Sequence, residues 1–196
     1  MKLIGITSET IFEGEAAQIV RWLECGLDQM HIRKPGYLSD EIATLLEHIP
    51  AEYHTRLILH DHFELAHEYP VGGLHLNRRN PVCPAGYQGI TGRSCHSLDE
   101  VKTCRDTTYC FLSPIYDSIS KKGYTSHFPA ETLDRARQEG IITQRVYALG
   151  GITPQQFPQI EGWGFGGAAM LGYLWEAASP EETAVRMETL KAYLRH

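Results

Sequence analysis

The chain has 196 residues, of which 42% are hydrophobic and 21% are charged, a balance typical of a globular protein with a real core. Its formal net charge is -6, and it contains no run of Lys and Arg residues. Nucleic acid and anionic membranes are therefore not expected as partners, because affinity for them depends mostly on clustered cations.

Short apolar runs alternate with helical patterns along the chain, as parallel βα units do. Predicted strands cover residues 2–7, 27–33, 56–61, 73–77, 90–95, 109–115, 145–149 and 168–171. Helical patterns cover about 16–23, 42–49, 63–68, 97–105, 129–140 and 180–194. Residues 78–89 contain Pro81, Pro84 and Gly86, so no full helix is expected there.

This order predicts an α/β protein with a compact (β/α)8 TIM barrel in which the helix after the fourth strand is reduced to a loop. Such barrels typically need ~250 residues, and ~200 is their lower limit. A doubly wound open sheet is the alternative, but no Gly-x-Gly-x-x-Gly follows the first strand. No linker or low-complexity segment marks a boundary, so residues 1–196 are expected to form a single domain.

The compartment is also suggested by the sequence. The first apolar segment, residues 1–7, is too short for a signal-peptide core, and no run approaches the ~18 residues of a membrane span. The five cysteines include no Cys-x-x-Cys pair, which is typical of reduced thiols and argues against structural zinc. We therefore expect a cytoplasmic protein; a homo-oligomer is compatible with the sequence, which leaves the oligomeric state open.

Cations are concentrated at the predicted C-terminal strand ends, although the chain as a whole is acidic. In a barrel these ends converge on one rim, which carries the functional site. The rim residues are His31, Arg33, Lys34, His60, Asp61, His62, His75, Arg78, Arg79, Ser94, His96, Ser118, Ser120, Lys121, Lys122, Gly150, Gly151 and Gly172. The contrast between rim and body predicts an anionic ligand.

Glycines follow the last two strands. Gly150 and Gly151 come after the seventh strand, and Gly172 comes after the eighth. Barrels commonly bind phosphate here through backbone N–H groups. Tight turns are the alternative explanation, because glycine is the usual residue where φ is positive.

Six motifs occur in an order that points to one family. They are His-Ile-Arg (31–33), His-Asp (60–61), Gly-Leu-His-Leu (73–76), Gly-Arg-Ser-Cys-His-Ser (92–97), Ser-Pro-Ile-Tyr-Asp-Ser-Ile-Ser-Lys-Lys-Gly (113–123) and Ala-Leu-Gly-Gly-Ile (148–152). In this order they resemble thiamine phosphate synthase and its close relative, the TenI-type thiazole tautomerase. The synthase joins hydroxymethylpyrimidine diphosphate to thiazole phosphate and releases pyrophosphate, which cations and Mg²⁺ stabilise.

The resemblance implies roles for individual residues. Arg33, Ser94 and Lys121 would be catalytic and would contact the pyrimidine diphosphate together with His31 and His60. Asp61 would bind Mg²⁺. The thiazole phosphate would be held by Ser118, Ser120, Gly150, Gly151, Leu171 and Gly172.

The sequence also departs from the family pattern. His31 replaces a glutamine, Pro35 a lysine, and His60 an asparagine, while Asn80 stands where the second metal aspartate is expected. Mg²⁺ prefers several hard oxygen ligands, so the amide at Asn80 predicts a weakened or lost metal site.

Two arginines in the same turn bear on this loss. Arg78 and Arg79 are candidates to replace part of the metal's charge. The alternative is that both are solvated loop side chains.

A tautomerase and a non-catalytic, ligand-binding or regulatory relative are the alternative functions. The tautomerase needs a general acid/base, whose family histidine aligns with Pro114, which leaves His31 and His60 as candidates. We expect His75 and His96 to be buried, neutral and hydrogen-bonded. His60 and His62 flank Asp61 and should point away from it, which argues against a zinc triad.

Overall fold

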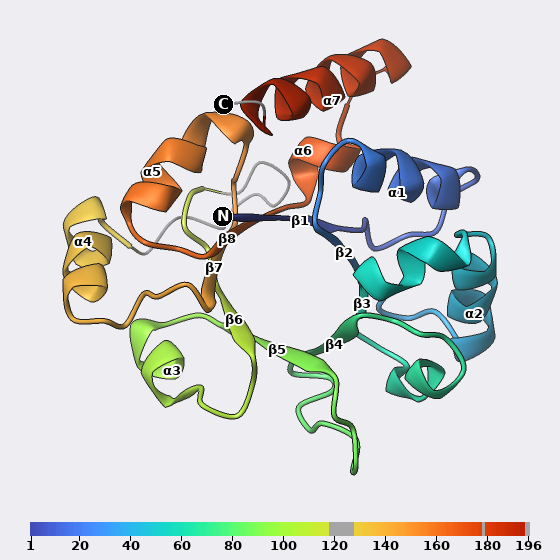
Figure 1. Ribbon diagram of the computed structural model, residues 1–196, viewed down its shortest axis with the longest axis horizontal. Coiled ribbons are helices and arrows are strands. Elements are labelled where there is room, and N and C mark those ends of the chain that lie inside the picture. The colour runs from blue at the N-terminus through green and yellow to red at the C-terminus, as the bar shows by residue number, and fades with distance from the viewer. Residues whose placement is uncertain (118–127, 178, 195–196) are drawn as a thin grey trace.

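In the computed structural model, which describes residues 1–117, 128–177 and 179–194, eight parallel strands close into a barrel (Figure 1). Each strand pairs with its neighbour in sequence, and β8 pairs with β1. The strands are β1 (Lys2–Ile6), β2 (Gln29–Ile32), β3 (Leu57–Leu59), β4 (Gly73–Leu76), β5 (Ile90–Cys95), β6 (Tyr109–Leu112), β7 (Val146–Leu149) and β8 (Gly167–Met170). The predicted barrel is therefore confirmed.

The helices lie outside the ring of strands (Figure 1). They are α1 (Glu15–Glu24), α2 (Ser39–Glu47), α3 (Leu98–Thr103), α4 (Ala130–Gln138), α5 (Phe157–Gly162), α6 (Gly172–Trp175) and α7 (Pro180–Leu194), with 3-10 helices η1 (Ala51–Arg56), η2 (Phe63–His67) and η3 (Pro154–Gln156). None of these described helices is long and apolar enough to cross a membrane.

The connection from β4 to β5 is the long loop that leaves the ring in Figure 1. Residues 77–89 are all described and contain no helix, as predicted. Pro81 and Pro84 have no backbone N–H to donate, and Gly86 has a positive φ of 79°. These residues explain why the helix is missing on this side of the barrel.

Side chains that alternate along the strands form two separate cores. The larger core lies between strands and helices and includes Leu3, Trp22 and Leu133. A smaller cluster lies within the barrel and contains Ile4, Ile6, Tyr109, Phe111, Tyr147 and Ala169. This inner cluster lies inside the barrel next to the polar residues of the rim.

Lys34 was predicted to be a rim cation, and the structure contradicts this. Its ammonium group is buried and donates hydrogen bonds to Glu15 Oε1 at 2.5 Å, Ser8 O at 2.9 Å and Thr10 O at 2.8 Å. Burial raises the pKa of Glu15 and lowers the pKa of Lys34, while their mutual attraction opposes both shifts. Because adjacent residues at a strand end face opposite ways, Arg33 lines the rim cavity and Lys34 turns away from it.

Candidate functional site

A cavity of about 1010 Å³ opens at the C-terminal ends of the strands. The residues around it come from strand ends distributed around the whole barrel. Those predicted from the sequence are Arg33, His60, Arg78, Arg79, Ser94, His96, Gly150, Gly151, Leu171 and Gly172, whereas His31 is fully buried and does not line the cavity. Ser118, Ser120, Lys121 and Lys122 lie outside the described residues.

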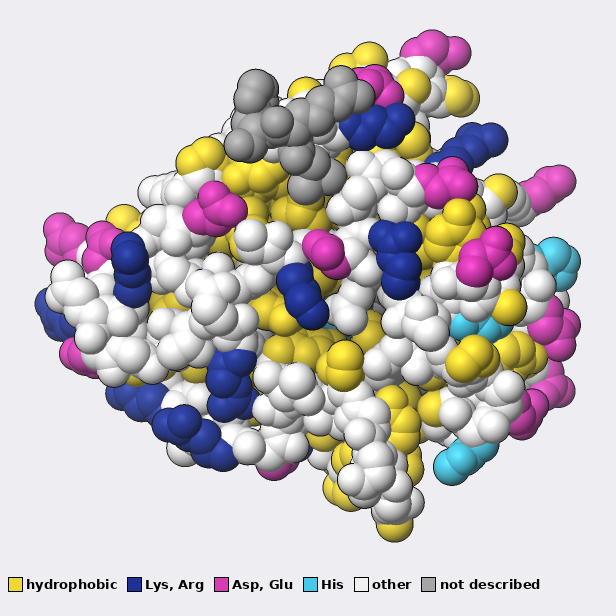
Figure 2. All heavy atoms as spheres, viewed as in Figure 1, with side chains coloured by type: hydrophobic (Ala, Val, Ile, Leu, Met, Phe, Trp, Pro, Cys, Tyr) yellow, Lys and Arg dark blue, Asp and Glu magenta, His cyan; other side chains and the backbone are white. Residues whose placement is uncertain are grey.

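Arginines dominate the charge of the cavity wall, but most of them are paired. Arg33 contacts Glu9 at 2.7 Å, and Arg93 contacts Asp106 at 2.7 Å. Arg78 is exposed and has no partner among the described residues. Basic and acidic side chains are interspersed on the molecular face in Figure 2.

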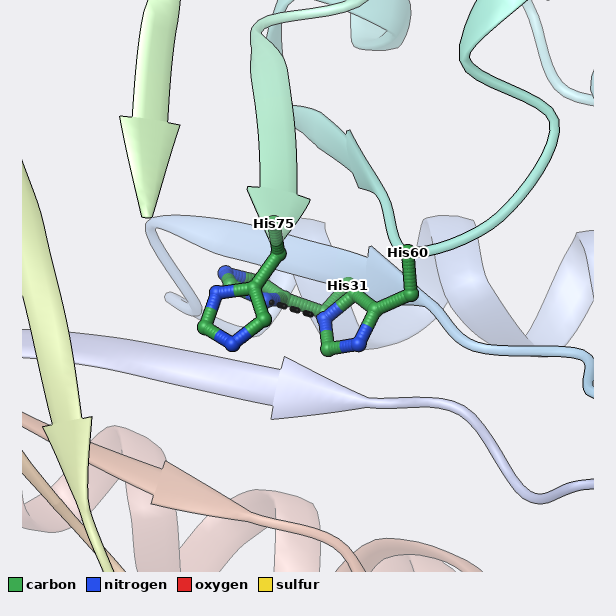
Figure 3. Close-up of side chains that lie close together, drawn as sticks. All are labelled: His31, His60 and His75. Atoms are coloured by element: carbon green, nitrogen blue, oxygen red, sulfur yellow. Dashed lines mark hydrogen bonds between the residues drawn. The ribbon is translucent and has the colours of Figure 1, made fainter. Parts of the chain in front are cut away.

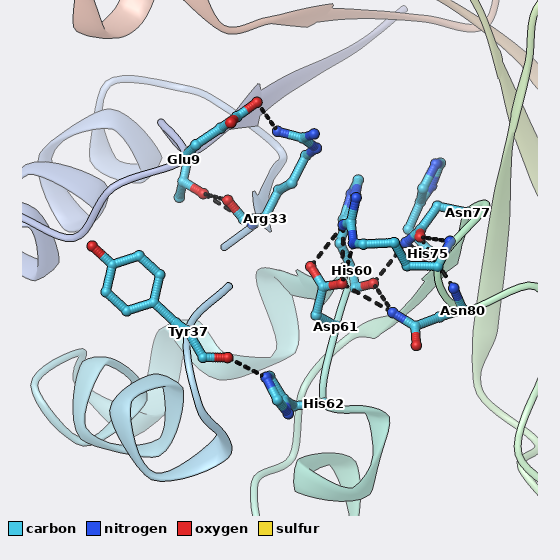
Figure 4. A network of polar contacts seen from close by, with 11 residues as sticks. Glu9, Arg33, Tyr37, His60, Asp61, His62, His75, Asn77 and Asn80 are labelled. Atoms are coloured by element: carbon cyan, nitrogen blue, oxygen red, sulfur yellow. Dashed lines mark hydrogen bonds and ion pairs between the residues drawn. The ribbon is translucent and has the colours of Figure 1, made fainter. Parts of the chain in front are cut away.

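Asp61 lies in a hydrogen-bond network that Figure 4 shows from close by. Arg79 donates to both of its carboxylate oxygens, Nε to Oδ1 and Nη2 to Oδ2, each at 2.9 Å. The side-chain amide of Asn80 donates to Asp61 Oδ1 at 2.9 Å and to His60 O at 3.1 Å. Asn77 shapes the turn, because its Oδ1 accepts from the backbone N–H groups of Arg79 and Asn80.

This donor set does not fit Mg²⁺. A small hard cation needs several oxygen ligands in near-octahedral geometry. Here both oxygens of Asp61 already accept from a guanidinium, and Asn80 turns its NH₂ group toward the carboxylate. The position that the resemblance assigns to a metal is thus next to a positive charge that the chain itself supplies.

Three histidines form a compact cluster between the inner core and the cavity (Figure 3). His31 Nδ1 lies 2.9 Å from His60 Nε2, and the rings of His60 and His75 stack with centroids 4.3 Å apart. Burial is the main cause that lowers the pKa of all three rings. The neighbouring imidazoles disfavour a further positive charge on His31 and His60, and Arg93 does so on His75. The cluster is therefore neutral at physiological pH.

The nitrogens of this cluster lie within 4.8 Å of one another, which is close enough to consider a metal. However, His75 is already bonded at both nitrogens, to Ser94 Oγ at 2.9 Å and to Tyr109 Oη at 3.1 Å. The ring planes of His60 and His75 are only 16° apart, so their in-plane lone pairs do not converge on one point. We interpret the cluster as a neutral hydrogen-bonding network.

The other histidine predictions had mixed outcomes. His75 is buried and hydrogen-bonded, as predicted. His96 is hydrogen-bonded to Ser113 at the rim, but the predicted burial was wrong, because its side chain is exposed. His62 turns away to Tyr37 O, so it shares no site with Asp61.

Gly150, Gly151 and Gly172 lie on the wall that β7 and β8 provide. Gly150 and Gly151 have φ angles of 103° and 64°, and a Cβ at Gly151 would lie 2.2 Å from Asp117 O. Turn geometry thus explains these two glycines in part. Among the described residues, the backbone N–H groups of Gly151 and Gly172 have no backbone partner, so they can donate to an anion.

Several residues of the site were missed at the sequence level. Arg93 and Glu9 were not singled out, and Tyr109 appears in the sequence only as part of an apolar strand. Arg93 falls within the Gly-Arg-Ser motif, so its position was a usable signal. Nothing in the sequence alone indicates that Tyr109 contacts His75.

Known proteins share both the sequence pattern and the barrel. Residues 3–174 match the family model described as thiamine monophosphate synthase. The thiamine-phosphate synthase of Lactococcus lactis subsp. cremoris (strain SK11) is 25% identical over 190 residues, covering 90% of this chain and 86% of the relative. That of Bacteroides fragilis (strain ATCC 25285) is 31% identical over 147 residues, covering 67% and 69%.

Solved structures give the same result. The crystal structure of thiamine phosphate pyrophosphorylase from Bacteroides thetaiotaomicron has a TM-score of 0.89 and 38% identity, covering 100% of this chain and 98% of its own. The pyrophosphorylase from Pyrococcus furiosus has a TM-score of 0.76, covering 99% and 95%, but its 20% identity shows the fold alone.

Proposed function

The chain belongs to the thiamine monophosphate synthase family, and on that premise we propose that it joins hydroxymethylpyrimidine diphosphate to thiazole phosphate, giving thiamine phosphate and pyrophosphate. The observation that carries this proposal is a cavity with two walls that each offer hydrogen-bond donors suited to an anion. Arg33, Arg78 and Arg79 follow β2 and β4, whereas Gly151 and Gly172 follow β7 and β8 on the opposite side of the closed barrel. Two separate phosphorylated substrates need such an arrangement.

The reaction breaks the bond from the pyrimidine methylene carbon to the diphosphate oxygen and forms a bond from that carbon to the thiazole nitrogen. The main task of the protein is then to stabilise negative charge on the departing pyrophosphate. Arg33 is proposed to leave its ion pair with Glu9 and bind the diphosphate instead. Ser94 is proposed to donate a hydrogen bond to the diphosphate. Neutral His60 lines the cavity and would face the pyrimidine without adding charge, whereas His31 is fully buried and would act only through its contact with His60.

The remaining roles rest on the resemblance. Lys121 is proposed at the diphosphate, and Ser118 and Ser120 at the thiazole phosphate. A cytoplasmic location and small phosphorylated ligands as partners are part of the same proposal.

We further infer that Mg²⁺ has a reduced role in this chain. The residues at Asp61 and Asn80 do not fit the ion, and Arg79 places a positive charge beside them. Arg79 would thus supply charge that the family obtains from a metal. Arg78 is exposed at the same wall, has no partner in the described part of the chain, and would assist from there.

A direct assay tests the function. Purified protein mixed with both substrates should produce thiamine phosphate, while thiazole alone should not be isomerised. The His60→Ala variant should mainly weaken substrate binding. If the protein instead isomerises the thiazole, and His60→Ala slows that step by about 10²-fold, the usual scale for a general acid/base, the tautomerase alternative would replace this proposal.

The Gly172→Ala variant should weaken thiazole phosphate binding by about tenfold or more, because the added methyl group displaces the Glu176 carboxylate beside the backbone N–H that is proposed to make a charge-assisted hydrogen bond. The fold should tolerate it, since the described atoms nearest to that Cβ belong to the flexible Glu176 carboxylate, at 3.2 Å. Isothermal calorimetry with thiazole phosphate measures the effect. Gly162→Ala is the matched control, because a Cβ there meets nothing within 4 Å. Equal affinity in both variants would place the phosphate elsewhere.

A further inference from the structure

A chain of hydrogen bonds runs from the inner core of the barrel to the cavity wall. It starts at Tyr109 on β6, passes through His75 on β4 and ends at Ser94 on β5, which lines the cavity. The strand register places these residues together, because Gly92 pairs with His75 on one side and with Tyr109 on the other. Ser94 lies two residues beyond Gly92 and therefore points into the barrel on the same side.

Gly92 provides the room for this chain. A Cβ at Gly92 would lie 2.1 Å from the Tyr109 ring and 2.4 Å from its hydroxyl oxygen. No φ angle in the left-handed region requires glycine there. The absence of a side chain at this position therefore serves the placement of the Tyr109 phenol against His75.

Tyr109, at the buried end of this hydrogen-bond chain, sets the direction in which the hydrogen bonds are donated. Tyr109 is only 2% exposed, and among the described residues its hydroxyl has one hydrogen-bond partner, His75 Nδ1. Burial raises the pKa of Tyr109, so the hydroxyl keeps its proton. A buried donor left without an acceptor costs more than an average hydrogen bond contributes, so Tyr109 donates to Nδ1.

The direction of the second hydrogen bond, from His75 to Ser94, follows because a neutral imidazole carries only one ring proton. Burial, with a smaller contribution from the positive charge of Arg93, lowers the pKa of His75 to about 3. Because Nδ1 accepts from Tyr109, the one ring proton is on Nε2 and is donated to Ser94 Oγ. Ser94 has no other partner among the described residues, which leaves its own hydrogen for the cavity.

We propose that Tyr109 and His75 are positioning residues that hold the Ser94 hydroxyl as a hydrogen-bond donor toward the cavity, and so favour an anionic oxygen, such as that of a diphosphate, at this wall. The reverse arrangement would have Ser94 donate to His75, and it would leave the buried Tyr109 hydroxyl without an acceptor. The identity of the anion rests on the proposed function. The direction of the hydrogen bonds does not rest on the proposed function, because it follows from the buried groups alone.

Nuclear magnetic resonance of ¹⁵N-labelled histidine reads the tautomer directly. The chain has ten histidines, and the signals lost in a His75→Gln variant identify those of His75. The proposal expects a neutral ring with the proton on Nε2 in the wild type. A ring protonated on Nδ1 overturns the proposal whatever the enzyme does.

Pyrophosphate binding tests the consequence. Calorimetry with inorganic pyrophosphate should show Tyr109→Phe weakening affinity by roughly threefold to tenfold, the range for loss of one hydrogen bond, and Ser94→Ala by about tenfold. In the Ser94→Ala background, Tyr109→Phe should have no further effect, because both changes act through one hydroxyl. Additive effects, or a wild type that binds no pyrophosphate, would overturn the proposal.

Tyr147→Phe is the matched control. Tyr147 is also buried and stacks on Tyr109 with centroids 5.0 Å apart, but its hydroxyl takes no part in the chain from Tyr109 to Ser94. The pyrophosphate affinity of the Tyr147→Phe variant should equal that of the wild type. If the tautomer and binding results hold but no thiamine phosphate forms, the proposed function fails and this inference stands.

Discussion

The Lys34→Met variant should lose about 3–5 kcal/mol of unfolding free energy, because it leaves the Glu15 carboxylate buried without its counter-ion. The pair is fully enclosed, with both side chains 0% exposed. Lys34 also donates to Ser8 O and Thr10 O, so its loss removes the contacts that fix residues 8–15. Urea denaturation measures the change in unfolding free energy.

The pH dependence of this variant has a definite sign. Burial already raises the pKa of Glu15, and removing Lys34 also removes the attraction that opposes this shift. A carboxyl whose pKa is raised in the folded state favours folding below that pKa and destabilises as pH rises through it. The deficit of Lys34→Met should therefore shrink as the pH falls through the raised pKa of Glu15 toward the ordinary pKa of a glutamate.

A surface pair supplies the control. Lys102 contacts Asp99 at 3.1 Å, but the two side chains are 50% and 88% exposed. Exposed ion pairs contribute about 0–1 kcal/mol to the free energy of unfolding, so Lys102→Met should change it little. Equal losses in Lys102→Met and Lys34→Met would contradict the assignment of a special role to the buried pair.

The barrel was predictable because short strand-like segments, most of them apolar, alternate with helical patterns along the chain. β5 and α7 have the bounds expected from the sequence, and the prolines of 78–89 correctly indicated a missing helix. Lys34 was misplaced because composition cannot tell which of two neighbours at a strand end faces inward. Only the register of β2 decides that Arg33 lines the cavity and Lys34 does not.

The site was predictable as a set of strand ends, but its hydrogen bonds were not. Arg78 and Arg79 are equivalent candidates in the sequence. The structure separates them, because the Asn77 side chain binds the backbone N–H of Arg79 and folds that arginine back onto Asp61. Tyr109 was missed because its contact with His75 joins strands that are not neighbours in the chain.

Removing Arg79 should lower pyrophosphate affinity by about tenfold or more, the scale of one lost charge-assisted hydrogen bond. Its guanidinium is proposed to supply positive charge beside Asp61, so wild-type affinity should be nearly the same in Mg²⁺ and in a chelator. The Arg79→Ala variant should bind pyrophosphate weakly both in Mg²⁺ and in a chelator. Calorimetry with inorganic pyrophosphate, with and without Mg²⁺, measures all of these affinities.

A metal-dependent site should be recoverable by two substitutions. Arg79→Ala frees both oxygens of Asp61, and Asn80→Asp places a second carboxylate beside it, since Asn80 Nδ2 is now 2.9 Å from Asp61 Oδ1. Two carboxylates meet the preference of Mg²⁺ for hard oxygen ligands, so the double variant should bind pyrophosphate only when Mg²⁺ is present. Arg78→Ala should cost less than Arg79→Ala, because no described residue holds Arg78 at the wall. Strong, saturable Mg²⁺ dependence in the wild type, together with unchanged affinity in Arg79→Ala, would restore the family's metal site and remove the proposed role of Arg79.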